Sequence, residues 1–186
     1  EKVEKIGEAS PEEKRRWKLV PEGEKLASKY LKGEANLGAE LSKYSAEDKR
    51  YVAEAVQDIL LRNITLPKID VARRNNRQAI DGIKMLKTDK VGVENVLSKM
   101  RRIFQHYDEQ GEQQRSEAYQ NLKREFEFRM RQAIQQQTGG VVPANFSVDV
   151  ERQPQFQEEW RRMLIQLDSQ YLRLIDDYKK EIQGLP

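Results

Sequence analysis

Residues 154–182, PQFQEEWRRMLIQLDSQYLRLIDDYKKEI, decide the fold class, because they keep an unbroken apolar face at helical spacing. Large apolar residues recur three or four positions apart over about eight turns, which is the pattern of an amphipathic helix. They are Phe156, Trp160, Met163, Leu164, Leu167, Tyr171, Leu174, Ile175, Tyr178 and Ile182. The stretch therefore predicts one long helix that packs along its whole length.

A second apolar seam precedes this helix, within the proline-free residues 89–137. Its steps of four and three are heptad-like and are typical of a coiled coil. The first members are Val93, Leu97, Met100, Phe104 and Tyr107. Residues 108–114 are polar apart from Gly111 and allow two interpretations, a helix–helix turn or the solvated middle of one helix. Because the seam keeps its phase across Gly111, we predict one helix.

The sequence between these two helices contains a stop signal and an extended segment. Thr138, Gly139 and Gly140 end the first helix, since glycine accepts the left-handed conformation found at the ends of many helices. Apolar residues then alternate with polar ones, which favours an extended linker at residues 138–153. We expect residues 89–183 to fold back as a long antiparallel helical hairpin.

The N-terminal part, residues 11–87, predicts a cluster of shorter helices. Ser10 and Pro11 form a helix start, and Pro21 predicts an early end, with Trp17 docked on the next segment of the chain. A further helix begins after Ser45, and another spans residues 68–87, where Gly82 indicates close packing. The predicted fold is an all-α, elongated helical bundle with two parts.

Composition supports an elongated protein and limits its chemistry. Hydrophobic residues make up 37% of the chain and charged residues 35%, so a compact sphere of 186 residues would lack apolar material. The chain has no cysteine, which excludes disulfides and thiolate metal sites. The absence of cysteine is compatible with the cytoplasm, where we expect the protein to lie. No apolar run approaches the length of a membrane span, and the polar helix faces carry many acids, so we expect no membrane contact.

Catalytic and cofactor motifs are missing from the sequence. His106 is the single histidine, and we expect it to be structural, because a multi-histidine metal site is excluded. Neighbouring acids such as Glu158 and Glu159 diverge on a helix, and Gly139–Gly140 lacks the Lys-Ser/Thr of a phosphate loop. We therefore predict no enzyme, no cofactor, no metal and no small-molecule substrate, and we keep an enzyme with a carboxylate-bound metal as a third, weaker alternative.

The middle of the chain carries the main charge asymmetry. Residues 68–107 contain ten Lys and Arg against four Asp and Glu. Clustered arginines on a helix can contact phosphates, although charged helices often carry such residues as ordinary surface. The candidate anion contacts are Arg73, Arg74, Arg77, Lys99, Arg101 and Arg102.

The two apolar seams are the strongest apolar pattern in the sequence. They either bury each other within one chain or leave apolar surface for a partner. Candidate packing or interface residues are Phe104, Phe126, Trp160, Leu167 and Tyr171. Long seams in a chain of low apolar content favour completion of the core by association, so we expect a homodimer or another protein partner. The predicted function is a non-enzymatic interaction or scaffold protein. The alternative is a nucleic-acid-associated protein that uses residues 68–102.

Overall fold

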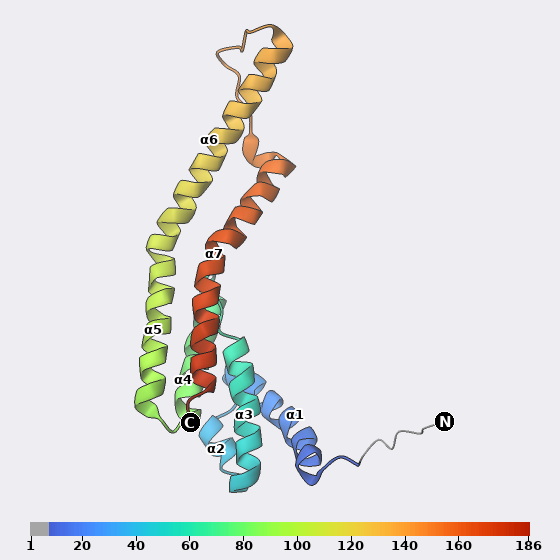
Figure 1. The fold of residues 1–186 in the computed structure, drawn as a ribbon, viewed down its shortest axis with the longest axis vertical. Coiled ribbons are helices and arrows are strands. Elements are labelled where there is room, and N and C mark those ends of the chain that lie inside the picture. The colour runs from blue at the N-terminus through green and yellow to red at the C-terminus, as the bar shows by residue number, and fades with distance from the viewer. Residues whose placement is uncertain (1–7) are drawn as a thin grey trace, which may run out of the picture. The chain divides into compact units, whose positions relative to one another are not determined.

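The computed structural model describes residues 8–186 and confirms the all-α fold class, with no β-strand in that range (Figure 1). Its contacts divide it into two compact units. The first contains the described residues up to Met100 together with Tyr178–Pro186, and the second is Arg101–Asp177. The elements are α1 (Pro11–Leu31), α2 (Leu37–Leu41), α3 (Ala46–Arg62), α4 (Asp70–Leu86), α5 (Lys90–Asp108), α6 (Gln110–Thr138), a 3₁₀ turn η1 (Val150–Arg152) and α7 (Pro154–Gln183).

Helix α1 runs through Pro21, so the predicted early end is wrong. Proline in a helix interior costs about 3 kcal/mol, because it removes one hydrogen bond and crowds the preceding turn. Pro21 and Trp17 are exposed and lie one turn apart, and Trp17 is 69% exposed instead of docked. Solvent can therefore satisfy the Trp17 carbonyl, while the opposite face of α1 is held by packing on α3.

The contact between α1 and α3 depends on a glycine. A Cβ added at Gly23 would lie 2.6 Å from the Cβ of Ala55 and 2.7 Å from the carbonyl oxygen of Val52. The backbones of the two helices therefore approach more closely than any side chain at position 23 would permit. Leu26 and Ala27 are buried on the same side of α1 and extend this interface.

Capping side chains and a buried amide define the helix ends of the first unit. Ser10 and Ser45 each accept a hydrogen bond from the backbone three residues later, at 3.2 Å, as their N-cap pattern predicts. Asn76 is buried in α4 and bonds the backbone N and O of Thr65, at 3.0 and 2.8 Å. This polar residue therefore fixes the connection that precedes α4.

Gly82 lies where the predicted close packing requires it. A Cβ there would be 2.6 Å from Leu60 and 2.7 Å from Tyr30, so the close-packing prediction is confirmed. The cost of glycine in α4 is thus offset by burial of two large neighbours against the helix backbone.

The first compact unit extends beyond the boundary that we expected near residue 88. Val93, Leu97 and Met100 of α5 are buried, and the contact division groups them with the N-terminal helices. The end of the chain belongs to the same unit, where Lys99 Nζ lies 3.4 Å from Glu181.

The second unit shows that residues 89–137 are not one helix. Glu109 departs from helical geometry, with φ −93° and ψ −81°, and separates α5 from α6. The prediction of an unbroken helix is therefore wrong, although the chain resumes helix at Gln110 without a longer turn. The unchanged phase of the apolar seam could not reveal a single-residue break.

Helices α6 and α7 run in opposite directions within the second unit. Tyr119 meets Trp160 at 5.1 Å between ring centroids, whereas Phe126, later in α6, meets Phe156, earlier in α7, at 5.4 Å. A small core forms where Phe126 and Phe156 meet Leu122 and Val150. Val150 belongs to η1, so the end of the predicted extended linker is a helical turn that is anchored in this core.

Candidate functional site

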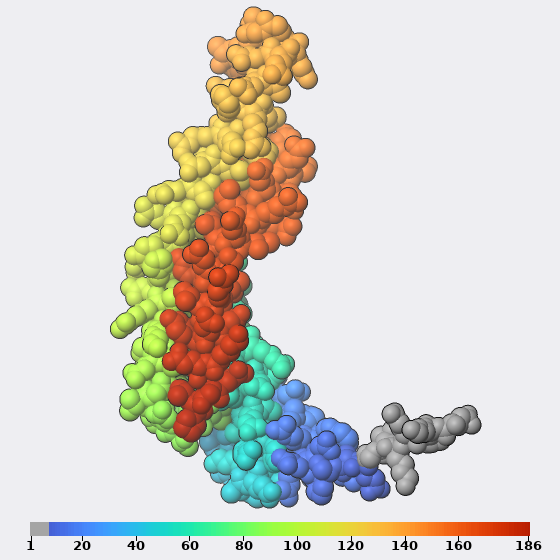
Figure 2. Space-filling model, in the orientation of Figure 1, coloured from blue at the N-terminus to red at the C-terminus, as the bar shows by residue number. Residues whose placement is uncertain are grey.

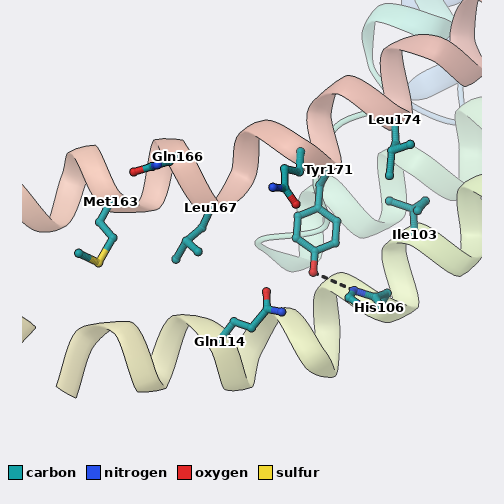
Figure 3. Close-up of a pocket in the computed structure, with 9 residues that line it drawn as sticks. Ile103, His106, Gln114, Met163, Gln166, Leu167, Tyr171 and Leu174 are labelled. Carbon is teal, nitrogen blue, oxygen red and sulfur yellow. Dashed lines mark hydrogen bonds between the residues drawn. The ribbon is translucent and has the colours of Figure 1, made fainter. Parts of the chain in front are cut away.

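A groove lies between the facing helices of the second unit. It has a volume of about 530 Å³, and Figure 3 shows Leu167 and Tyr171 of one wall pointing toward the other wall, which carries Gln114 and His106. α5 and α6 supply Ile103, His106 and Gln114, and α7 supplies Met163, Gln166, Leu167, Gln170, Tyr171 and Leu174. The i, i+3 and i+4 spacing of the α7 residues places them on one face.

A tyrosine and a histidine meet in this groove. The hydroxyl of Tyr171 lies 2.8 Å from Nδ1 of His106 (Figure 3), and the ring of Tyr171 meets Tyr107 edge to face. Burial raises the pKa of Tyr171, the positive charge of Arg115 lowers it, and the negative charge of Asp168 raises it. Tyr171 is therefore a neutral hydrogen-bonding group at physiological pH, and its contact with His106 ties the two walls together.

Arg115 and Gly111 make the contacts next to the break between α5 and α6, beside the groove. Arg115 donates a hydrogen bond of 3.2 Å to the carbonyl oxygen of Tyr107, near the end of α5. Its guanidinium carbon lies 4.0 Å from the centre of the Tyr107 ring, a cation–π geometry. A Cβ at Gly111 would lie only 3.0 Å from the Tyr171 hydroxyl. The absence of a side chain at Gly111 therefore leaves room for this hydroxyl.

The lining combines apolar side chains with polar ones and contains no Lys, Arg, Asp or Glu. Apolar groups form its walls, and the glutamine amides can each donate and accept hydrogen bonds. Such a surface suits apolar side chains carried on a helix, which is how amphipathic helices dock into grooves.

The predicted interface residues divide between the groove and the core. Leu167 and Tyr171 line the groove, and Phe104 is half-buried on α5. Phe126 is buried in the aromatic core, and Trp160 packs against that core through Tyr119, at 5.1 Å between ring centroids. The last two therefore hold the unit together and offer little to a partner.

Sequence reasoning missed several groove residues that its own pattern contained. Met163 and Leu174 are members of the predicted apolar face of α7, and Gln166 and Gln170 lie beside them. The helical spacing could have identified the two apolar residues. The amides have no such signal, because glutamine is common on exposed helix faces.

The predicted anion contacts are separated into different environments. Arg74 and Arg77 lie together on α4, where they line a hollow of about 430 Å³ with Lys32. Arg73 approaches Asp70 at 4.0 Å, and Lys99 pairs with Glu181. The exposed residues Arg101 and Arg102 belong to the second unit.

The acidic side chains of the described chain are dispersed over its helices. Within residues 8–186, no group of three or more His, Asp or Glu side chains is arranged to hold a metal ion. None of the helices that the structure describes combines the length and the apolar character needed to cross a bilayer.

The fold and groove define an all-α protein with a helix-lined groove in its second unit. Residues 38–184 match the family described as a family of unknown function (DUF6657), and the chain belongs to this family. The match extends over both compact units and includes every residue of the groove. No curated protein and no solved structure matches the chain.

Proposed function

We propose that this chain is a non-enzymatic interaction protein that binds a helix of a partner in the groove of residues 101–177. The observation that supports this proposal is the lining of a groove of about 530 Å³, which combines apolar walls with glutamine amides and has no Lys, Arg, Asp or Glu. A site of this kind gains affinity by removing apolar area from water and needs no ionic partner. Association should therefore depend little on salt concentration.

The occupant that we propose is a second copy of the chain. The outer flank of α7 carries Ile165 and Leu172, which are 56% and 44% exposed although both are large and apolar. They are seven positions apart, so they project from one face two turns apart, the spacing of helix-in-groove anchors. Each copy thus carries both a groove and an exposed apolar stripe, which is the requirement for a symmetric dimer in which each stripe enters the partner's groove.

Sedimentation equilibrium over a range of concentrations tests this proposal. Wild type is expected to dimerise, and Leu172→Glu and Leu174→Glu should each shift the dimer dissociation constant upward by at least about tenfold. Val91→Glu is the matched control, because Val91 is 75% exposed on the part of α5 that belongs to the first unit. A wild type that stays monomeric, or a Val91 variant that weakens the dimer equally, would contradict the proposal.

The second candidate is nucleic-acid binding, and one observation favours it. The hollow formed by Lys32, Arg74 and Arg77 also contains the amides of Asn75 and Gln78 and has no acidic side chain among its lining residues. Both arginines are exposed, and among residues 8–186 neither makes an ion pair. Such a surface can contact backbone phosphates without reading bases.

A salt titration of single-stranded RNA binding tests this second candidate. Three phosphate contacts predict that log K falls with log salt concentration with a slope of about −2. Arg74→Gln with Arg77→Gln should reduce that slope by more than half, whereas Arg131→Gln with Arg173→Gln, which removes the same charge from exposed positions of the second unit, should change it little. No binding at about 50 mM salt would exclude this candidate.

A further inference from the structure

A second apolar cavity lies in the first compact unit and contains a buried lysine. It has a volume of about 500 Å³ and is formed by α2, α3 and the connection from α4 to α5. The lining residues are Leu37, Gly38, Leu41, Lys49, Ala53, Met85, Leu86, Lys87, Thr88 and Lys90. Three of the ten are lysines, and none is acidic.

Lys87 is the unusual member of this lining, because it is only 7% exposed. Its ammonium group has three donors, and one of them bonds the carbonyl oxygen of Leu185 at 2.5 Å. In the described part of the chain no carboxylate forms an ion pair with it. A buried charge without a counter-charge is unfavourable, so this position favours an anion from outside the chain.

The surroundings of Lys87 agree with this conclusion. Burial lowers its pKa, and the charge of Glu54 raises it. Glu54 is already engaged by two arginines, at 3.4 Å from Arg50 and 3.8 Å from Arg16. Glu54 therefore forms its ion pairs with Arg50 and Arg16 and not with Lys87.

The other two lysines of the lining, Lys49 and Lys90, differ in their hydrogen bonds. Lys90 is exposed, and its Nζ donates to the carbonyl oxygens of Lys84 and Met85, at 2.5 and 3.4 Å. Lys49 is exposed, and within residues 8–186 its side chain has no ion pair, so it can add a second positive charge at the mouth of the cavity. The cavity therefore combines one buried cation with two exposed cations.

The remaining walls suit a hydrocarbon. Leu37 and Leu41 are buried and form apolar wall, and Met85 is half exposed beside them. Methionine is flexible and polarisable, so its side chain can fold over an apolar guest. An amphiphile with an anionic head and a hydrocarbon chain would match this arrangement, because the lysines suit the head and the apolar walls suit the chain.

We propose that this cavity binds an amphiphilic carboxylate, with its head on Lys87 and its hydrocarbon chain along Leu37, Leu41 and Met85. The site is independent of the groove in residues 101–177 and adds a ligand that the sequence did not predict. The head would supply the counter-charge that Lys87 lacks, and the hydrocarbon chain would cover the half-exposed side chain of Met85.

Calorimetric titration of the full chain with decanoate tests the proposal, with 1-decanol and acetate as matched probes. Decanoate should bind at one site, and decanol, which lacks the charge, should bind at least about tenfold more weakly. Acetate, which lacks the hydrocarbon chain, should show no saturable binding. Lys87→Met should weaken decanoate binding by at least about tenfold, whereas Lys18→Met, at an exposed position of α1, should leave it unchanged.

Several outcomes would overturn the inference. They are equal affinity for decanoate and decanol, unchanged affinity in Lys87→Met, or no decanoate binding by wild type. The Lys87 variant is expected to fold, because replacing a buried lone cation by an apolar side chain of similar length is often neutral or stabilising. Ala53→Phe provides a second, independent variant that fills the cavity without touching the lysine, and it should also weaken decanoate binding.

Discussion

Replacing Gly23 by alanine should destabilise the protein, although alanine favours helix more than glycine does. The added Cβ would lie 2.7 Å from the carbonyl oxygen of Val52, about 1 Å inside an ordinary contact. A backbone atom cannot rotate away, so the overpacking cost should lie near the upper end of the usual range, about 3 kcal/mol. Alanine regains about 1 kcal/mol of helix propensity. The net loss is therefore about 2 kcal/mol, or about 4–8 °C in melting temperature for a chain of this size.

Urea and thermal unfolding followed by circular dichroism would measure this loss. Gly38→Ala is the matched control, because its Cβ would meet Asn36 at 3.4 Å and Met85 at 3.8 Å, which are ordinary contacts. The control should be as stable as wild type or slightly more stable. If Gly23→Ala were also as stable as wild type, the inferred close approach of α1 and α3 would be wrong.

Three further predictions concern the second compact unit. Phe156→Ala removes a buried ring from the aromatic core and should cost about 3–5 kcal/mol in urea unfolding. Tyr171→Phe removes the hydroxyl that lies 2.8 Å from His106, and its cost should be about 1 kcal/mol, measured in the same way. The hydrogen bond from Arg161 lowers the pKa of Glu158 to about 2, so the stabilisation that it provides is present above about pH 4.5 and is lost as the pH falls toward 2. Carbon-detected NMR should find that pKa, and Arg161→Gln should move it back toward 4.5.

The helix content of this fold was predictable because it depends on local patterns. The start at Ser45, the end at Thr138 and the long helix from Pro154 all rest on cap residues and apolar spacing within a few turns. Pro21 misled the prediction, since its local penalty is outweighed by packing on α3, a partner that lies far along the sequence. The residues around Pro21 do not indicate such a long-range contact.

The candidate sites were less predictable than the helices. Leu167 and Tyr171 were expected at an interface and line the groove, because they share the apolar face of α7. Lys87 was only one cation of a basic segment in the sequence. Its burial results from α2, α3 and the end of the chain packing around it. Residue spacing within one helix cannot predict such long-range packing.

The connection between α6 and α7 gives the second unit a place where the chain can be cut. Ala144 and Asn145 are exposed there, and the segment, coloured orange in Figures 1 and 2, lies at the surface beyond the aromatic core. The pairing of α6 with α7 depends on ring contacts such as Phe126 with Phe156, which a cut backbone would leave in place. The protein could therefore be expressed as two fragments that reassemble, with the new ends free to carry the halves of a split reporter.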